Sequence, residues 1–279
     1  MRIKICYFSG TGNSYFIAKK INEYIIDSEL VSIVKFLNQD NNLIEGEKII
    51  LVFPVYALTL PIPVRKFLAR AKFKDTSYIC AIATRWGVKF DDFKRIDKLI
   101  KPRKLNSHFI INMGNNDVKV KNYCCPTETD FLEIEEIAEI KLRKIVSVIE
   151  NNEDCLYKDD NYIEDMLDSG YKGKILQWMI PKMMTFSEYI GGVNYFYINT
   201  KCSGCGICSK ICLSSKIKLQ GNQPVWQKKT LCYMCYACIN YCPTRAIEIK
   251  SIIGVPSFTH VNERYSHPYA SYMVIKNQK

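Results

Sequence analysis

Histidine is scarce in this chain of 279 residues, which contains only His108, His260 and His267. Histidine is the side chain that most often serves as a general acid or base near neutral pH. We expect these three residues to occupy loop or core positions, and we assign no residue as a catalytic acid, base or nucleophile. The sequence alone leaves open whether the chain is an enzyme.

A long uninterrupted apolar run is also absent. The longest one, from Ile49 to Val64, contains three prolines and is too short and too broken for a membrane-spanning helix. Gly10 and Gly12 interrupt the first apolar run before the core of a signal peptide is complete. We therefore expect a soluble cytoplasmic protein that does not bind membranes.

Acidic residues are outnumbered by basic ones, 28 to 39, which gives a formal net charge of +11. No run rich in Lys and Arg stands out, so we do not expect nucleic-acid binding. A positive field suits an acidic protein partner. Nothing in the composition sets the oligomeric state.

Cysteine is abundant, with 13 residues, and eight of them follow one spacing twice. The first C-x2-C-x2-C-x3-C run is Cys202, Cys205, Cys208 and Cys212, and the second is Cys232, Cys235, Cys238 and Cys242. In such runs three cysteines hold one [4Fe–4S] cluster and the fourth ligates the other cluster. The expected ligand sets are therefore Cys202, Cys205, Cys208 and Cys242, and Cys232, Cys235, Cys238 and Cys212.

Zinc and disulfides are the alternatives for these cysteines. Structural zinc usually takes two separated cysteine pairs, whereas each run here carries four cysteines. Disulfides need an oxidising compartment, and nothing suggests export. The spacing resembles that of the bacterial two-cluster ferredoxins, although Leu213 follows Cys212 where those proteins normally have proline.

Strands and helices alternate through residues 1–150. Short apolar runs predict strands at 3–8, 30–36, 48–53, 77–83 and 107–113. Helices are predicted after the loop at 9–14 and over 61–71, 91–101 and 128–150. This order predicts an α/β fold with a doubly wound, parallel, five-stranded sheet.

The rest of the chain divides into three expected parts. Residues 151–194 read as a helical linker, residues 195–250 as a small α+β module with two clusters, and residues 251–279 as an aromatic-rich tail. The two cysteine runs form an internal duplication.

A loop rich in glycine and hydroxyl groups comes directly after the first predicted strand and opens a helix. Its residues are Ser9, Gly10, Thr11, Gly12, Asn13 and Ser14. Glycines allow backbone N–H groups to approach a phosphate, and the helix N-terminus adds partial positive charge. The loop has no terminal lysine and no G-x-G-x-x-G, which disfavours a P-loop and a dinucleotide site. It resembles the phosphate loop of flavodoxins, which takes the single phosphate of FMN.

Two further loops end strands on the same edge of the predicted sheet, where ligands of open parallel sheets bind. The first is Pro54, Val55, Tyr56, Ala57 and Leu58, and the second is Thr84, Arg85, Trp86 and Gly87. The resemblance implies that these loops grip the isoalloxazine ring. Tyr56 or Trp86 is expected to stack on the ring, unless both are ordinary packing aromatics, and Arg85 to place a positive charge near it.

A flavodoxin-like half followed by a two-cluster ferredoxin half resembles the flavodoxin–ferredoxin fusion proteins of anaerobes. The tail adds Arg264-Tyr-Ser-His-Pro268, similar to an R-Y-x-[HN]-P ending of that family. The resemblance implies electron transfer between FMN, two [4Fe–4S] clusters and an external low-potential redox protein. The alternative is a flavoenzyme that reduces a small molecule at FMN, with the segment 112–125 and the tail as possible covers of the flavin.

Overall fold

The computed structural model describes residues 3–158, 175, 178–180, 182–183, 196–251 and 256–279. Most of the expected helical linker therefore lies outside the described residues. We refer to residues 3–158 as the N-terminal half and to residues 196–279 as the C-terminal half. No helix within the described ranges is long and apolar enough to cross a bilayer.

A parallel sheet of six strands forms the centre of the N-terminal half, in the order β2-β1-β4-β6-β7-β8. The strands are β1 (Ile3–Tyr7), β2 (Ser28–Ser32), β4 (Lys48–Pro54), β6 (Tyr78–Arg85), β7 (Ser107–Asn112) and β8 (Cys155–Leu156). Apart from the short edge strand β8, the order is the one found in flavodoxin-like doubly wound sheets. The predicted α/β fold is therefore confirmed, but the sheet has six strands and not five, because Cys155–Leu156 of the expected linker pairs with β7.

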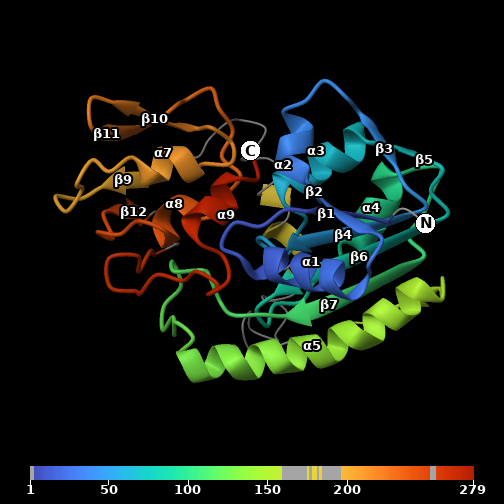
Figure 1. Ribbon diagram of the computed structural model, residues 1–279. Coiled ribbons are helices and arrows are strands. Elements are labelled where there is room, and N and C mark those ends of the chain that lie inside the picture. The colour runs from blue at the N-terminus through green and yellow to red at the C-terminus, as the bar shows by residue number, and fades with distance from the viewer. Residues whose placement is uncertain (1–2, 159–174, 176–177, 181, 184–195, 252–255) are drawn as a thin grey trace.

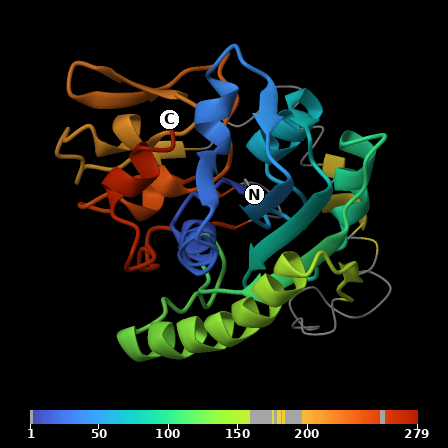
Figure 2. The same cartoon turned by 45° about the vertical axis from the view of Figure 1, so that its right-hand side comes forward.

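Helices cover both faces of this sheet. Every residue of β4 and β6 is therefore buried, although the side chains alternate between the two faces. Ile50 and Val52 face α1 (Asn13–Tyr24) and α5 (Glu128–Glu150). Leu51 and Phe53 face α2 (Ile33–Leu37), α3 (Ile62–Arg70) and α4 (Phe93–Leu99). Figures 1 and 2 show α5 running along the outside of the sheet.

Local sequence signals account for several element boundaries. Thr127 and Asp130 form a capping box that starts α5 where the prediction placed it. The prediction of a strand over 30–36 was wrong beyond Ser32, because the Ser32 side chain accepts a hydrogen bond from the Lys35 N–H and starts α2. A two-stranded ribbon of β3 (Leu43–Glu45) and β5 (Lys72–Lys74) was not predicted.

The C-terminal half shows the expected duplication. Its two antiparallel pairs are β9 (Phe196–Ile198) with β12 (Ile247–Ile249), and β10 (Ile217–Gln220) with β11 (Gln223–Trp226). Short helices α7 (Ile207–Ile211) and α8 (Ala237–Asn240) occupy matching places, because each begins two residues after the second cysteine of its run and contains the third; α9 (Tyr272–Lys276) lies in the tail.

The two halves share one hydrophobic core. Ile211, Leu213, Ala237 and Ile275 belong to the same buried cluster as the α2–α4 face of the sheet. The C-terminal half packs at the edge where the parallel strands end, as Figure 1 shows in orange and red. This packing places the cysteine runs beside the loops that follow β1, β4 and β7.

Candidate functional site

Four cysteines from both runs line one cavity in the C-terminal half. They are Cys202, Cys205, Cys208 and Cys242. We call this set the outer quartet, because Cys205 is exposed to solvent. The backbone N–H of Ala246 donates to the Cys242 Sγ over 3.2 Å, so one sulfur already has a hydrogen-bond donor.

The other four cysteines line a second cavity. They are Cys212, Cys232, Cys235 and Cys238. We call this set the inner quartet, because Cys235 contacts the N-terminal half. The N–H of Met234 donates to the Cys232 Sγ over 3.4 Å. Each quartet takes three cysteines from one run and the fourth from the other.

Burial makes these thiols weak acids. It raises the pKa of Cys208 and Cys232 to about 11 and that of Cys235 to about 12, and neighbouring thiolates of the same quartet add to each shift. The pKa of Cys238 is raised further by burial and by the neighbouring cysteines. Cysteines must lose their protons to act as metal ligands, so the binding of a metal centre by these thiols would release protons.

The spread of the thiols bears on what they can bind. Among the described residues, no three His, Cys, Asp or Glu side chains converge closely enough to hold a single metal ion. Four thiolates around one zinc all lie about 2.3 Å from it and are therefore packed together.

Left-handed backbone conformations shape both cysteine loops in the same way. Gly204 and Gly206 have φ of 70° and 73° in the outer loop. Met234 and Tyr236, at the equivalent places of the inner loop, have φ of 54° and 53°. A residue with a Cβ pays about 1–2 kcal/mol for this conformation, which glycine avoids. The inner loop therefore keeps two side chains at a conformational cost.

The predicted phosphate loop joins β1 to α1, as expected, and all six of its residues are buried. Gly12 has φ of 110° and caps α1 without a side-chain hydrogen bond. No described atom accepts a hydrogen bond from the backbone N–H groups of Thr11, Asn13 or Ser14. Unpaired N–H groups at a helix N-terminus suit an anion.

The cysteine module and the tail enclose this loop. A Cβ on Gly10 would lie 2.5 Å from the carbonyl oxygen of Cys235, and one on Gly12 would lie 2.6 Å from the His267 Cβ. The His267 N–H donates to the Thr11 carbonyl over 2.9 Å. The absence of a Cβ at Gly10 and Gly12 thus allows the cysteine module and the tail to approach the loop closely. The sequence did not indicate this role of the two glycines.

The tail also engages the polar side chains around the loop. The Tyr265 hydroxyl donates to the Asn13 Oδ1, and the Asn13 Nδ2 donates to the Gly114 carbonyl over 2.9 Å. The Gln278 side chain bonds both the N–H and the carbonyl of Ser9, over 3.0 and 2.8 Å. These hydrogen bonds from the tail hold the phosphate loop in place.

An open cavity lies between the halves, next to the loop. Its volume is about 640 Å³, the mouth included. It is lined by Val55, Tyr56, Ala57, Asn116, Asp117, Lys119, Met234, Cys235 and Tyr236. We call it the interdomain cavity. The Tyr56 hydroxyl is buried beside Gly10 without a hydrogen-bond partner of standard geometry among the described residues.

The structure brings only part of the predicted ring site to this cavity. Val55, Tyr56 and Ala57 line it, and Ala57 and Leu58 have φ of 47° and 65°. Asp117 and Lys119 belong to the segment 112–125, which the sequence indicated as a possible cover of the flavin. Met234 and Tyr236, the non-cysteine positions of the second run, were not singled out. Burial raises the pKa of the Asp117 carboxyl.

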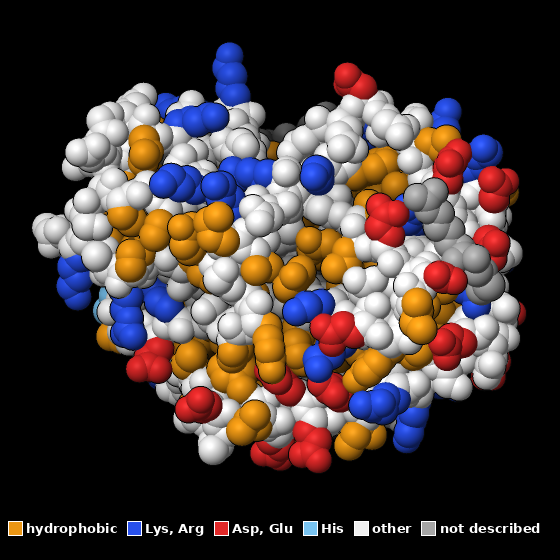
Figure 3. All heavy atoms as spheres, in the orientation of Figure 1, with side chains coloured by type: hydrophobic (Ala, Val, Ile, Leu, Met, Phe, Trp, Pro, Cys, Tyr) orange, Lys and Arg blue, Asp and Glu red, His pale blue; other side chains and the backbone are white. Residues whose placement is uncertain are grey.

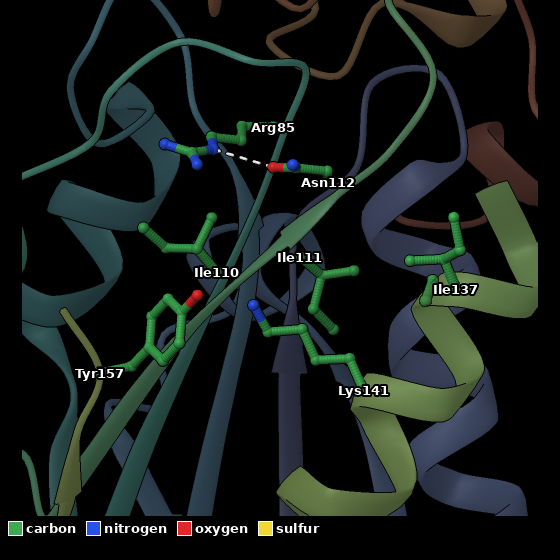
Figure 4. A pocket seen from close by; sticks show the side chains of 8 residues that line it. Arg85, Ile110, Ile111, Asn112, Ile137, Lys141 and Tyr157 are labelled. Atoms are coloured by element: carbon green, nitrogen blue, oxygen red, sulfur yellow. Dashed lines mark hydrogen bonds between the residues drawn. The ribbon is translucent and has the colours of Figure 1, made fainter. Parts of the chain in front are cut away.

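The second predicted ring loop, residues 84–87, does not line the interdomain cavity. The Thr84 hydroxyl bonds the Ser14 hydroxyl over 2.7 Å, and Gly87 takes a left-handed turn. Arg85 donates to the Asn112 Oδ1 over 3.0 Å and lines a different pocket, together with Lys141 and Tyr157, as Figure 4 shows. The Trp86 side chain is 40% exposed.

Comparison with known proteins adds to this geometry. A ferredoxin of Methanothermococcus thermolithotrophicus is 36% identical to the chain over 52 residues, which are 18% of the chain and 87% of that ferredoxin. Through this segment the chain belongs to the ferredoxin family. No family model matches the chain.

Two solved structures align with part of the chain beyond what this ferredoxin covers. A flavodoxin from the domain Archaea aligns with a TM-score of 0.31 and 15% identity over 53% of the chain and 99% of its own length. The azoreductase AzrA aligns with a TM-score of 0.32 and 11% identity over 54% of the chain and 100% of its own length. At these TM-scores the fold assignment rests on the strand order of the sheet.

Proposed function

We propose that the chain is an electron-transfer protein in which FMN and two [4Fe–4S] clusters exchange electrons within one molecule. The observation that carries this proposal is the assembly of two exchanged cysteine quartets, one of which lies against the phosphate loop. Cysteine quartets with this exchange are typical of two-cluster ferredoxins. The external redox partner supplies or removes electrons one at a time.

The donor sets fit these groups. Each quartet supplies four thiols around one cavity, and the N–H groups of Met234 and Ala246 would remain as donors to ligand sulfurs. Hydrogen bonds to sulfur raise the reduction potential of such clusters. In the N-terminal half, the N–H groups of Thr11, Asn13 and Ser14 would hold the FMN phosphate.

The interdomain cavity is where we place the flavin ring. Tyr56 lines one side and the Met234–Tyr236 loop the other, and Cys235 of the inner quartet lies on the wall between the cavity and Gly10. FMN accepts or gives one or two electrons and so matches one-electron clusters to two-electron chemistry. The chain would orient the groups, because the two halves that hold them share one buried cluster.

The open mouth of the interdomain cavity keeps a second function in view, namely reduction of a small molecule at the flavin. Asp117 and Lys119 line the cavity and provide polar groups for such a substrate. Protein reduced in advance and mixed with candidate organic acceptors separates the two functions. Turnover without a protein acceptor would favour the flavoenzyme.

Anaerobic purification with quantification of iron, sulfide and flavin tests the main proposal. We expect about eight iron, eight sulfide and one FMN per chain. The variants Cys205→Ala and Cys235→Ala should each lose about half of the iron, because each cysteine serves one cluster. Unchanged iron in either variant, or two zinc ions without sulfide, would refute the ligand assignment.

The flavin site has its own test. Thr11→Leu places a bulky apolar side chain within the buried phosphate loop and removes the hydroxyl that accepts from Asn116 over 2.7 Å. We expect this variant to lose FMN and keep its iron. Retained flavin would show that the loop does not hold the phosphate.

A further inference from the structure

Positive charge is concentrated in the C-terminal half. Residues 196–279 contain 11 Lys and Arg and only 2 Asp and Glu, whereas the rest of the chain has 28 and 26. Figure 3 shows Lys and Arg side chains over the C-terminal half at the left and most acidic side chains at the right and along the lower edge. Two oxidised clusters would each contribute about −2, which leaves this half positive.

Basic residues flank the exposed side of the outer quartet. Lys201 precedes Cys202, and Arg245 follows Cys242 by three residues; both are exposed. Asn199 holds these two segments together, because its side chain bonds the Lys201 N–H over 2.9 Å and the Arg245 carbonyl over 3.5 Å. Neither basic residue forms an ion pair with an acid in the described part of the chain.

An apolar contact point lies among these charges. The Leu219 side chain is 41% exposed, and its Cδ1 lies 3.0 Å from the position of a Cβ on Gly206. It therefore covers the outer cysteine loop, and the exposed Lys218 precedes it on β10. A small apolar centre with a charged rim is the usual composition of a transient protein interface.

The inner quartet lies against the N-terminal half, and none of its cysteines is exposed as Cys205 is. Its Cys235 packs against Gly10, and Tyr233 packs edge-on against Phe8 of the N-terminal half, with ring centroids 6.3 Å apart. An electron from outside therefore meets the outer quartet first.

We propose that the surface formed by Lys201, Leu219 and Arg245, which we call the basic port, docks an acidic one-electron carrier protein at the outer quartet. This rests on the proposed function. One electron leaves the carrier, which is oxidised by one unit, and the outer cluster is reduced by one unit. A cluster held by the inner quartet would then pass the electron to a flavin in the interdomain cavity. Single-stranded nucleic acid is disfavoured, because it requires exposed aromatic platforms and the port is centred on Leu219.

Binding between oxidised proteins tests the port without turnover. The probe is an acidic bacterial ferredoxin, titrated calorimetrically into the fully loaded chain at low and high salt. The test variant Lys201→Glu/Arg245→Glu is matched by Lys66→Glu/Lys94→Glu, which changes two exposed lysines on α3 and α4 of the N-terminal half by the same charge. Iron, sulfide and flavin are measured in every sample.

We expect the port variant to bind the ferredoxin at least about tenfold more weakly at low salt, with a similar loss in the rate of electron transfer from reduced ferredoxin. The control should change by less than about twofold. Equal losses in both variants, no binding to the loaded parent, or binding of single-stranded RNA in place of ferredoxin would overturn the proposal. Protein that carries no iron would instead refute the proposed function.

Discussion

Acid should destabilise this protein through His267, whose imidazole is buried over the phosphate loop. Its side chain is fully buried and stacks on Phe16, with ring centroids 4.5 Å apart. The Tyr269 N–H approaches its Nδ1 over 3.4 Å, and its Nε2 has no hydrogen-bond partner within the described residues. Burial lowers the pKa of His267 to about 4 from a usual 6.5.

The sign and size of the effect follow from proton linkage. Between pH 6.5 and 4 the unfolded chain binds the His267 proton and the folded chain does not, so stability falls as the pH falls through this window. From pH 7 to 5.5 the loss from this one group is about 1 kcal/mol. Glu135, whose Oε1 lies 3.5 Å from the imidazole Nε2, would recover part of it by pairing with the charged ring.

Anaerobic urea unfolding of the loaded protein at pH 7 and 5.5 measures this loss. His267→Phe keeps a ring against Phe16 and removes the titrating group, so its free energy of unfolding should change less between the two pH values than that of the parent. His260→Gln, at an exposed position, serves as the control and should behave like the parent. A His267→Phe variant with the same pH dependence as the parent would show that the buried imidazole is not the cause.

Three further substitutions test the contacts around the site. Lys48→Met should lower the free energy of unfolding by about 2 kcal/mol, because the buried ammonium donates to the carbonyls of Ile149 and Glu150 at the end of α5 over 2.5 and 3.0 Å. Thermal and urea unfolding measure this loss, and an unchanged free energy would show that these hydrogen bonds do not stabilise the end of α5. Tyr265→Phe should cost about 1–2 kcal/mol and weaken flavin retention, since it removes the hydrogen bond to Asn13; flavin release after dilution checks this. Gly204→Ala should lose iron from the outer quartet only, because its Cβ would lie 2.8 Å from the Asn222 carbonyl; full iron content would contradict it.

Local sequence patterns predicted the strands and helices correctly where only one secondary structure fits the pattern. The apolar runs of β4 and β6 suit strands buried on both faces, and Thr127 signals the start of α5. The run from Leu30 to Phe36 was misassigned because a short apolar segment fits a strand and a buried helix equally well. Only the cap formed by Ser32 separates the two.

The grouping of the cysteines was predictable, because the spacing of the two runs indicates which cysteines lie together. The four cysteines that line each cavity are those expected from the C-x2-C-x2-C-x3-C spacing of the two runs. The individual contacts that enclose the phosphate loop were not predictable, since they depend on Tyr265, His267 and Gln278, which are more than two hundred residues away along the chain. The expectation that the tail covers the flavin site came from its tyrosines, and the structure places one of them, Tyr265, on the loop.

The difference between the two cysteine loops follows from what each loop faces. Gly204 and Gly206 adopt the left-handed turns of the outer loop without steric cost. Met234 and Tyr236 adopt the same turns with side chains, and both line the interdomain cavity. A conformational cost of about 1–2 kcal/mol for each residue is retained only where the side chain serves another purpose. Enclosing the proposed flavin site is a purpose that fits Met234 and Tyr236. Under the two proposals above, the duplicated runs have diverged into one loop for the protein partner and one for the cofactor.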